Sequence, residues 1–363
     1  MADWLKYLLI VVSLAVGNNM NAQHHEEGAA HEESAGFKPG PFIVEHIGDA
    51  YEWHIVAVKG RHVSVPLPVI IYSRQSGFHC FLSSKLHHGE YKGLSIAGED
   101  HPNKGKIVEQ LADGTLAKPL LDISITKNVL SLFVSVMFLL WMFISVANRY
   151  KAKPNSAPKG LQSLIEPFIL FIRDTIARPA IGKQYERFMP YLLTVFFFIF
   201  INNLMGLIPF FPFGANLTGN ITVTVVLALL TFIITLKNSN RHYWVHIVNP
   251  AGVPWWLKIP IPLMPLIEFV GVLTKPVTLL IRLFANITAG HIIALSFFSL
   301  IFIFGAKNIA VGYGMSVFSV AFTVFMTVLE LLVSVLQAYV FTLLSAIYFG
   351  GAIAEPHPKH STH

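Results

Sequence analysis

The stretch Pro276-Val277-Thr278-Leu279-Leu280-Ile281-Arg282-Leu283-Phe284-Ala285-Asn286-Ile287-Thr288-Ala289-Gly290-His291 places one arginine in the middle of a long apolar segment. Apolar residues continue past His291 to Phe304, so Arg282 is not expected at the edge of a membrane. A guanidinium in hydrocarbon costs about 2.5–3.5 kcal/mol on insertion scales, and arginine cannot relieve that cost by losing its proton. The sequence therefore predicts a functional role for Arg282, with polar partners on neighbouring helices.

The composition around this stretch is that of an integral membrane protein. Of 363 residues, 54% are hydrophobic and only 13% are charged, and the mean hydropathy is +0.58. These values are too apolar for a soluble protein of this length. The single cysteine, Cys80, excludes an intrachain disulfide and a multi-cysteine metal site. The formal charge of +6 does not indicate nucleic-acid binding, because much of the basic excess lies in one loop between apolar segments.

Five apolar segments are long enough to cross a bilayer as helices, which predicts an all-α polytopic fold. They run from about 129 to 146, 190 to 211, 221 to 236, 262 to 305 and 314 to 349. At 1.5 Å per residue the last two exceed a hydrocarbon core of about 30 Å, so they are expected to tilt strongly or bend. A turn near 307–313 is expected to join them as an antiparallel pair.

The distribution of lysine and arginine predicts the orientation of the chain. The loop 149–187 is the most basic, which marks it as cytoplasmic. Apolar residues at helical spacing between Leu161 and Ile176 predict an amphipathic helix on that surface. The N-terminal region then lies outside, and five crossings leave the C-terminus inside.

The N-terminal region is expected to contain three parts before the membrane domain at 125–363. Residues 1–22 resemble a signal peptide, because the apolar run Tyr7 to Val16 is too short to span a membrane; an uncleaved anchor is the alternative. Residues 23–36 are polar and predicted to be disordered, although their histidines and glutamates could bind a metal. Residues 37–124 form an extracytoplasmic domain with a β-hairpin around Lys59-Gly60-Arg61 and strands near 69–72 and 78–82. Its histidines lack the spacing of metal ligands.

The last two helices carry few polar side chains, and their levels can be compared. We place Gln337 at the same depth in the membrane as Arg282. The helical rise then puts His291 about 13.5 Å, and Glu330 about 10.5 Å, from that depth toward the outer side. A carboxylate and an imidazole are therefore expected to meet at one depth, which is the composition of a proton relay. Glu268 and Lys275 lie on the cytoplasmic side of Arg282, and Asn286 shares the face of Arg282.

These motifs resemble subunit a of F-type ATP synthases. The resemblance rests on Lys275-Pro276 through Asn286 to Ala289-Gly290, on Leu336-Gln337-Ala338 with Tyr348, and on the segment Asn203 to Pro209; it covers about 161 to the C-terminus. Family members commonly place an acid where His291 stands and a histidine where Glu330 stands, so this chain has the pair exchanged. The long N-terminal domain departs from the family pattern.

The resemblance implies a stator subunit that conducts protons through two half-channels to and from a ring of c subunits and couples their flow to rotation. Arg282 is then the stator charge that faces the ring, with Asn286 and Gln337 beside it. His291 and Glu330 belong to the outer path, and Glu268 belongs to the inner path. Further partners implied are the peripheral-stalk b subunits and the lipid bilayer of a bacterial inner membrane.

The sequence predicts neither a catalytic residue nor a cofactor. It has no phosphate loop of the GxxxxGK[ST] type, so no bound nucleotide is expected, and no metal is assigned. One rival interpretation is a secondary transporter or channel in which Arg282 binds an anionic substrate. A redox subunit with haem is a second rival, but bis-histidine ligation needs two histidines within the spans and only His291 lies there.

Overall fold

The computed structural model describes residues 39–58, 61–86, 89–98, 101, 103, 105–111, 114–152, 157–208, 213–248 and 263–354. The predicted signal peptide and the polar segment 23–36 lie outside these residues. The described residues divide into two compact units, one up to Leu130 and the other from Ser131 onward. Each unit is described by itself.

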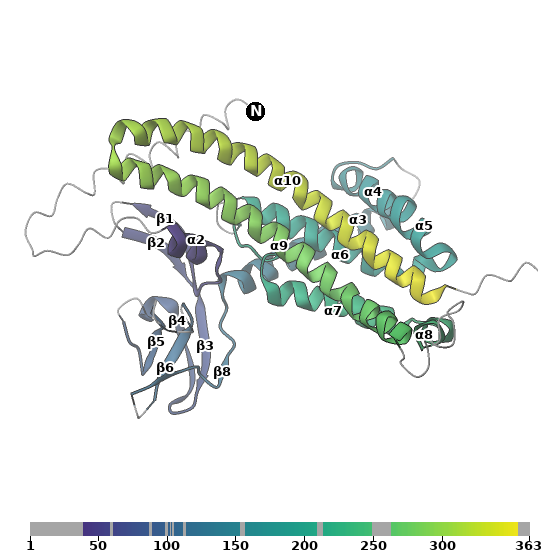
Figure 1. Cartoon of the computed structure of the whole chain (residues 1–363), viewed down its shortest axis with the longest axis horizontal. Coiled ribbons are helices and arrows are strands. Elements are labelled where there is room, and N and C mark those ends of the chain that lie inside the picture. Colours follow the sequence, from purple (N-terminus) through teal and green to yellow (C-terminus); the bar gives the residue numbers. More distant parts are fainter. Residues whose placement is uncertain are drawn as a thin grey trace, which may run out of the picture. The chain divides into compact units, whose positions relative to one another are not determined.

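The first unit contains small antiparallel sheets, which Figure 1 draws in purple and blue. A short helix, α2 (Pro39–Ile47), precedes the hairpin of β1 (Glu52–Val58) and β2 (Arg61–Pro66), so the predicted hairpin is confirmed. The predicted strands near 69–72 and 78–82 are β3 (Pro68–Ser73) and β4 (Gly77–Leu82). The other elements are η2 (Ser83–Leu86), β5 (Leu94–Ile96), β6 (Ile107–Gln110), β7 (Leu116–Ala117) and β8 (Leu121–Asp122), in the sheet orders β4-β3-β8 and β5-β6-β7.

A separate hydrophobic core supports this unit. Val69 and Ile71 of β3, Phe81 of β4, Leu94 of β5 and Ile107 of β6 are all buried in one cluster. Alternate residues of β3 supply the core, as expected for a strand whose successive side chains point to opposite faces.

The first unit also includes the start of the first long helix, α3 (Lys127–Ala152). The Asp49 carboxylate accepts hydrogen bonds from the Asn128 backbone N–H at 3.0 Å and from Thr126 Oγ1 at 2.8 Å. The Lys127 N–H donates to the carbonyl of Ala50 at 2.8 Å. An acidic side chain therefore caps the free N–H groups at the start of α3, an arrangement that also suits the helix dipole.

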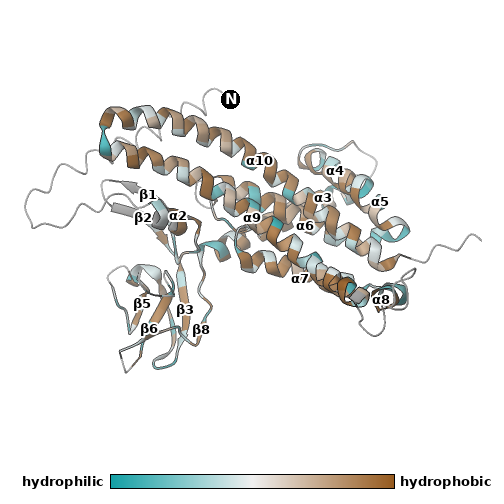
Figure 2. Ribbon diagram, viewed as in Figure 1, coloured by the Kyte–Doolittle hydropathy of each residue, from teal (hydrophilic) through white to brown (hydrophobic). Residues whose placement is uncertain are grey.

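The second unit consists of helices. After α3 it contains α4 (Leu161–Phe171), a π-helical turn η3 (Ile172–Ala177), α5 (Arg178–Ile181), η4 (Gly182–Gln184), α6 (Tyr185–Leu207), α7 (Ile221–Lys237), α8 (Arg241–Val248), α9 (Leu263–Lys307) and α10 (Ile309–Ile353). Figure 2 shows that these helices are predominantly hydrophobic. The segment 161–176 is helical, as α4 and η3, while its amphipathic character and its place at a membrane surface remain predictions.

The helices are those of a multi-pass membrane protein. Among the described residues, four helical segments are long and apolar enough to cross a bilayer: α3, the segment from α4 to α6 (Leu161–Leu207), α9 and α10. Helix α7 reaches this length only together with α8, and the two are bent by 101°. Each of the five predicted segments therefore contains a helix, but the third does not qualify as a span without α8.

Several predicted boundaries were wrong by a few residues. Helix α6 begins at Tyr185 and contains Pro190, whereas the sequence placed its start at Pro190. The turn expected at 307–313 is a single residue, Asn308, whose side chain accepts a hydrogen bond from the Ala310 N–H at 2.9 Å. Gly312 lies within α10 and packs closely against Gly305 of α9. A Cβ added at Gly312 would lie 2.7 Å from the Gly305 Cα.

The core of the second unit is aromatic. Phe196 and Phe197 of α6 and Phe349 of α10 are fully buried, and the rings of Phe188 and Phe349 stack with centroids 4.8 Å apart. Helix α10 packs along both α9 and α6 (Figure 1).

Candidate functional site

Arg282 lies on the exposed face of α9. Leu279, Leu283 and Ile287 form a face about 100° further round the helix and are buried with at most 3% of their surface exposed. Arg282 and Asn286 are exposed, and within the described part of the chain neither takes part in a hydrogen bond or an ion pair, although Arg282 interacts electrostatically with Tyr348 of α10. The guanidinium therefore lies on an exposed surface of α9 that it shares with Thr278, Asn286 and apolar side chains such as Ile281.

His291 and Glu330 meet between α9 and α10. The distance from His291 Nδ1 to Glu330 Oε1 is 3.2 Å, and the side chains are 22% and 8% exposed. This contact agrees with the depth at which the sequence placed the two residues. An imidazole and a carboxyl group at this distance can exchange a proton through a hydrogen bond.

The close approach of Glu330 depends on Gly290. A Cβ added at Gly290 would lie 3.0 Å from Glu330 Oε1 and 3.3 Å from its Cδ, which is tighter than ordinary van der Waals contact. On the other side, a Cβ at Gly206 of α6 would lie 3.9 Å from His291 Nε2. Gly290 thus leaves room for the Glu330 carboxyl group, while Gly206 is in ordinary contact range of the imidazole.

Asn203 links α6 to the turn of α10 that carries Glu330. Its Nδ2 donates to the carbonyl of Ser334 at 3.3 Å, and its Oδ1 accepts from Thr218 Oγ1 at 2.6 Å. Ser334 Oγ in turn donates to the carbonyl of Glu330 at 2.8 Å. The sequence analysis used Asn203 only as part of the family motif; an amide inside an apolar helix was the signal that could have identified this role.

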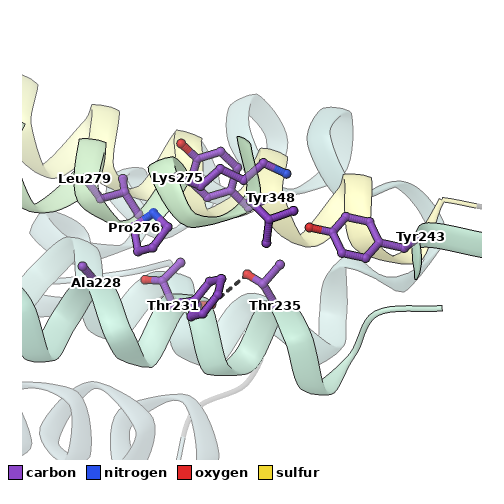
Figure 3. A pocket seen from close by; sticks show the side chains of 10 residues that line it. Ala228, Thr231, Thr235, Tyr243, Lys275, Pro276, Leu279 and Tyr348 are labelled. Carbon is purple, nitrogen blue, oxygen red and sulfur yellow. Dashed lines mark hydrogen bonds between the residues drawn. The ribbon is translucent and has the colours of Figure 1, made fainter. Parts of the chain in front are cut away.

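A second polar cluster surrounds Lys275 on α9. Its Nζ lies 5.5 Å from the ring centroid of Tyr243 on α8 and 5.5 Å from that of Tyr348 on α10, within the range of cation–π attraction. These side chains line a cavity of about 10 Å³ together with Thr231 and Thr235 of α7 (Figure 3). Glu268 interacts electrostatically with both Lys275 and Tyr243. Lys275 therefore holds α8 and α10 against α9.

The remaining predicted residues fall into two environments. Gln337 is buried with 3% of its surface exposed, on α10 beside Ser334, whereas Arg282 is exposed. No hydrogen bond between these two residues is found in the described part of the chain. Glu268 is half-buried near the start of α9. The six predicted residues therefore comprise two exposed neighbours, Arg282 and Asn286, a contacting pair, His291 with Glu330, and two separate members, Gln337 and Glu268.

This arrangement can carry charge through an apolar bundle. Residues that titrate, or that are permanently charged, occur along α9 at Glu268, Lys275, Arg282 and His291, with Glu330 opposite. Ionisable groups within apolar helices are costly, and they mark ion pathways or binding sites. No group of three or more histidine, cysteine or acidic side chains that could hold a metal ion occurs among the described residues.

Comparison with known proteins assigns most of the chain to one family. A sequence model described as the ATP synthase A chain matches residues 129–350, and a domain of unknown function, DUF8433, matches residues 42–127. The ATP synthase subunit a of Chloroherpeton thalassium is 44% identical over 245 residues, which cover 66% of this chain and 69% of that protein. The subunit a of an Anaeromyxobacter species is 34% identical over 353 residues, or 92% of this chain and 75% of that protein.

The first match contains the whole Arg282 stretch, both members of the His291–Glu330 pair and the Asn203 network. The second ends at Lys127, the first residue of α3. The similarity to the Anaeromyxobacter protein covers most of the N-terminal unit as well. The chain therefore belongs to the family of subunit a of the F-type ATP synthase.

Proposed function

We propose that this chain is the proton-conducting stator subunit of its ATP synthase, and that it passes protons to and from a ring of c subunits through two half-channels. The observation that carries the proposal is the position of Arg282, an exposed cation with no acidic partner among the described residues, on a largely apolar helix. A charge kept on such a surface is explained by a partner of opposite charge that arrives from another subunit.

The mechanism uses a rotor carboxyl group that alternates between two states. The neutral carboxyl can face lipid, whereas the ionised form cannot do so at low cost. Near Arg282 the opposite charge favours ionisation, and the proton leaves toward the inner side past Glu268. The carboxylate then passes Arg282 and regains a proton from the outer path through Asn286, His291 and Glu330. Arg282 also prevents direct passage of protons between the two half-channels.

The energy for rotation comes from the charge that crosses the membrane. One proton that falls through 100 mV releases about 2.3 kcal/mol, and the ring transmits that energy to ATP synthesis on other subunits. In this proposal the chain has no catalytic site of its own. The ring and the peripheral-stalk b subunits are its protein partners.

The proposed orientation follows from the basic loop at 149–187. The loop lies on the cytoplasmic side of a bacterial inner membrane, the N-terminal unit lies outside and the C-terminus lies inside. An N-terminal signal peptide would agree with this orientation.

Removal of the charge at Arg282 tests the proposal. Arg282→Ala in the assembled complex should abolish ATP-driven proton pumping into inverted membrane vesicles. Lys307→Ala, which removes an exposed cation at the end of the same helix, should leave pumping near the unaltered level. Pumping that persists in Arg282→Ala complexes with normal subunit content would contradict the stator role.

A further inference from the structure

One sheet of the N-terminal unit is apolar on both faces. Its inner face packs into the core through Val69, Ile71 and Phe81. Its outer face is exposed and is called here the apolar sheet face; its members are Tyr72, Phe78, Cys80, Leu82, Leu121 and Ile123. An antiparallel sheet with one side in water normally alternates apolar and polar residues, so this exposed set requires an explanation.

The strand register places these side chains together. Tyr72 of β3 pairs with Phe78 of β4 on one side and with Leu121 of β8 on the other. Cys80 and Leu82 follow Phe78 at alternate positions of β4, and the Ile123 N–H donates to the carbonyl of Ile70 at 2.9 Å. Phe78, Ile123 and Leu121 are 67%, 61% and 52% exposed. None of the six side chains carries a formal charge at neutral pH.

The same sheet is joined to the start of α3 by a short strap. From Ile123 to Lys127 the chain has four steps, which span at most about 14 Å. The strap remains attached to the sheet, because the Ile125 N–H donates to the carbonyl of Pro68 at 2.9 Å. Asp49 caps the first turn of α3 from within the same unit.

These contacts limit how far the sheet can lie from a bilayer that α3 crosses. Helix α3 is 26 residues long and apolar enough to span a bilayer, and a span of this length has its first turn near the boundary of the hydrocarbon core. The polar headgroup layer outside that core is about 5–8 Å thick on each side. The strap is too short to carry β8 far beyond this layer.

We propose that the apolar sheet face rests on the lipid leaflet at the N-terminal end of α3. Tyrosine and phenylalanine are side chains that favour the membrane–water boundary, and leucine and isoleucine favour the acyl region below it. The face is uncharged and continuous, through β8 and the strap, with the point where α3 enters the bilayer. The lipid leaflet is therefore the occupant that the chain itself brings closest to the face.

The only cysteine of the chain provides a probe within this face. Cys80 is exposed, so a nitroxide spin label can be attached there in the assembled complex without a change in sequence. The complex is reconstituted into phospholipid bilayers, with reactive cysteines of its other subunits replaced. Power-saturation measurements then compare collision with oxygen, which concentrates in lipid, and with a water-soluble nickel chelate.

The matched control is a label on another sheet of the same unit. Gln110 of β6 is exposed and lies outside the apolar sheet face, so Gln110→Cys in a Cys80→Ser background places the same nitroxide elsewhere. We expect several-fold greater oxygen than nickel accessibility at Cys80, relative to Gln110. Phe78→Asp should shift the Cys80 label toward nickel accessibility, because a charge would be driven out of the lipid.

Two results would overturn the proposal. A Cys80 label as accessible to the nickel chelate as the Gln110 label would mean that the face is in water. A Cys80 label shielded from both reagents, equally in bilayers and in delipidated detergent complexes, would mean that another protein surface covers the face.

Discussion

At the scale of single residues, the His291–Glu330 contact is the most specific element of the site. The two side chains are 3.2 Å apart, and the family commonly has the acid and the imidazole in exchanged positions. We expect the double variant His291→Glu with Glu330→His to retain more ATP-driven proton pumping than either single variant. Each single change leaves two like groups in contact, whereas the double change restores the pair.

The comparison is a double-mutant cycle on initial pumping rates in inverted vesicles. Residues in contact couple by about 0.5–3 kcal/mol. A double variant that pumps no better than the worse single variant would argue against a shared role of the two residues.

The pair could be predicted from sequence, but the space it needs could not. Helical rise along two antiparallel helices was enough to place the imidazole and the carboxyl group at one depth. The requirement for glycine at 290 depends on how closely α9 approaches α10, and no local pattern encodes that distance. The same reason hid the link from Asn203 to Ser334, which joins residues 131 positions apart.

Gly290→Ala tests whether that space matters. The added methyl group would lie 3.0 Å from Glu330 Oε1, so Glu330 must move away from His291. Overpacking of this kind costs about 1–3 kcal/mol, and we expect a severe loss of pumping. Gly271→Ala on the same helix is the control, because nothing lies within 4 Å of a Cβ there. Equal pumping by the two variants would show that the position of Glu330 is not critical.

At the scale of secondary-structure elements, apolar runs identified the helices but not their ends. The last two helices were predicted to be separated by a turn of several residues, and only Asn308 separates them. Gly312, which lies in the predicted turn, belongs to α10 and packs closely against Gly305 of α9. Glycine is compatible with a turn and with a tight helix contact, and the partner helix decides between them.

A second helix contact of this type can be tested at the end of α10. A Cβ at Gly350 would collide with the backbone carbonyl of Ala180 on α5, while nothing lies within 4 Å of a Cβ at the adjacent Gly351. We expect Gly350→Ala to lower the free energy of unfolding of the subunit in the complex by about 1–3 kcal/mol, because backbone atoms cannot move aside easily.

Gly351→Ala is the matched control and should be neutral or slightly stabilising, since alanine favours helix. The measurement is retention of this subunit in detergent-purified complexes after graded heating. Identical retention of both variants would mean that α5 and α10 do not form the close contact.

At the scale of the whole molecule, the sequence predicted a membrane part preceded by a small β-containing unit, and both are present. Composition was sufficient for that division, because a bilayer and water select very different side chains. The strand order could not be predicted from the sequence. Strand β8 pairs with β3 across 48 or more intervening residues, and that pairing places the strap next to the apolar sheet face. Long-range pairing of this kind is set by the tertiary core rather than by local pattern.

We also expect the N-terminal unit to lose stability without a change in the helical unit, and Tyr51 offers a test. Its hydroxyl donates to Asp122 Oδ2 at 2.6 Å, and burial together with this carboxylate raises the pKa of Tyr51 above its ordinary value. The native unit thus holds the phenol proton more tightly than the unfolded chain, whose tyrosines ionise near pH 10. This contribution to stability is present below about pH 10 and is lost as the pH rises further.

Tyr51→Phe should therefore lower the free energy of unfolding by about 1 kcal/mol at neutral pH and remove the loss of stability at alkaline pH. Both effects are measured by proteolysis of the N-terminal unit in intact complexes. Proton pumping at neutral pH should be unchanged, because the substitution lies in the other unit; a parallel loss of pumping would show that the N-terminal unit and the helical unit act as one.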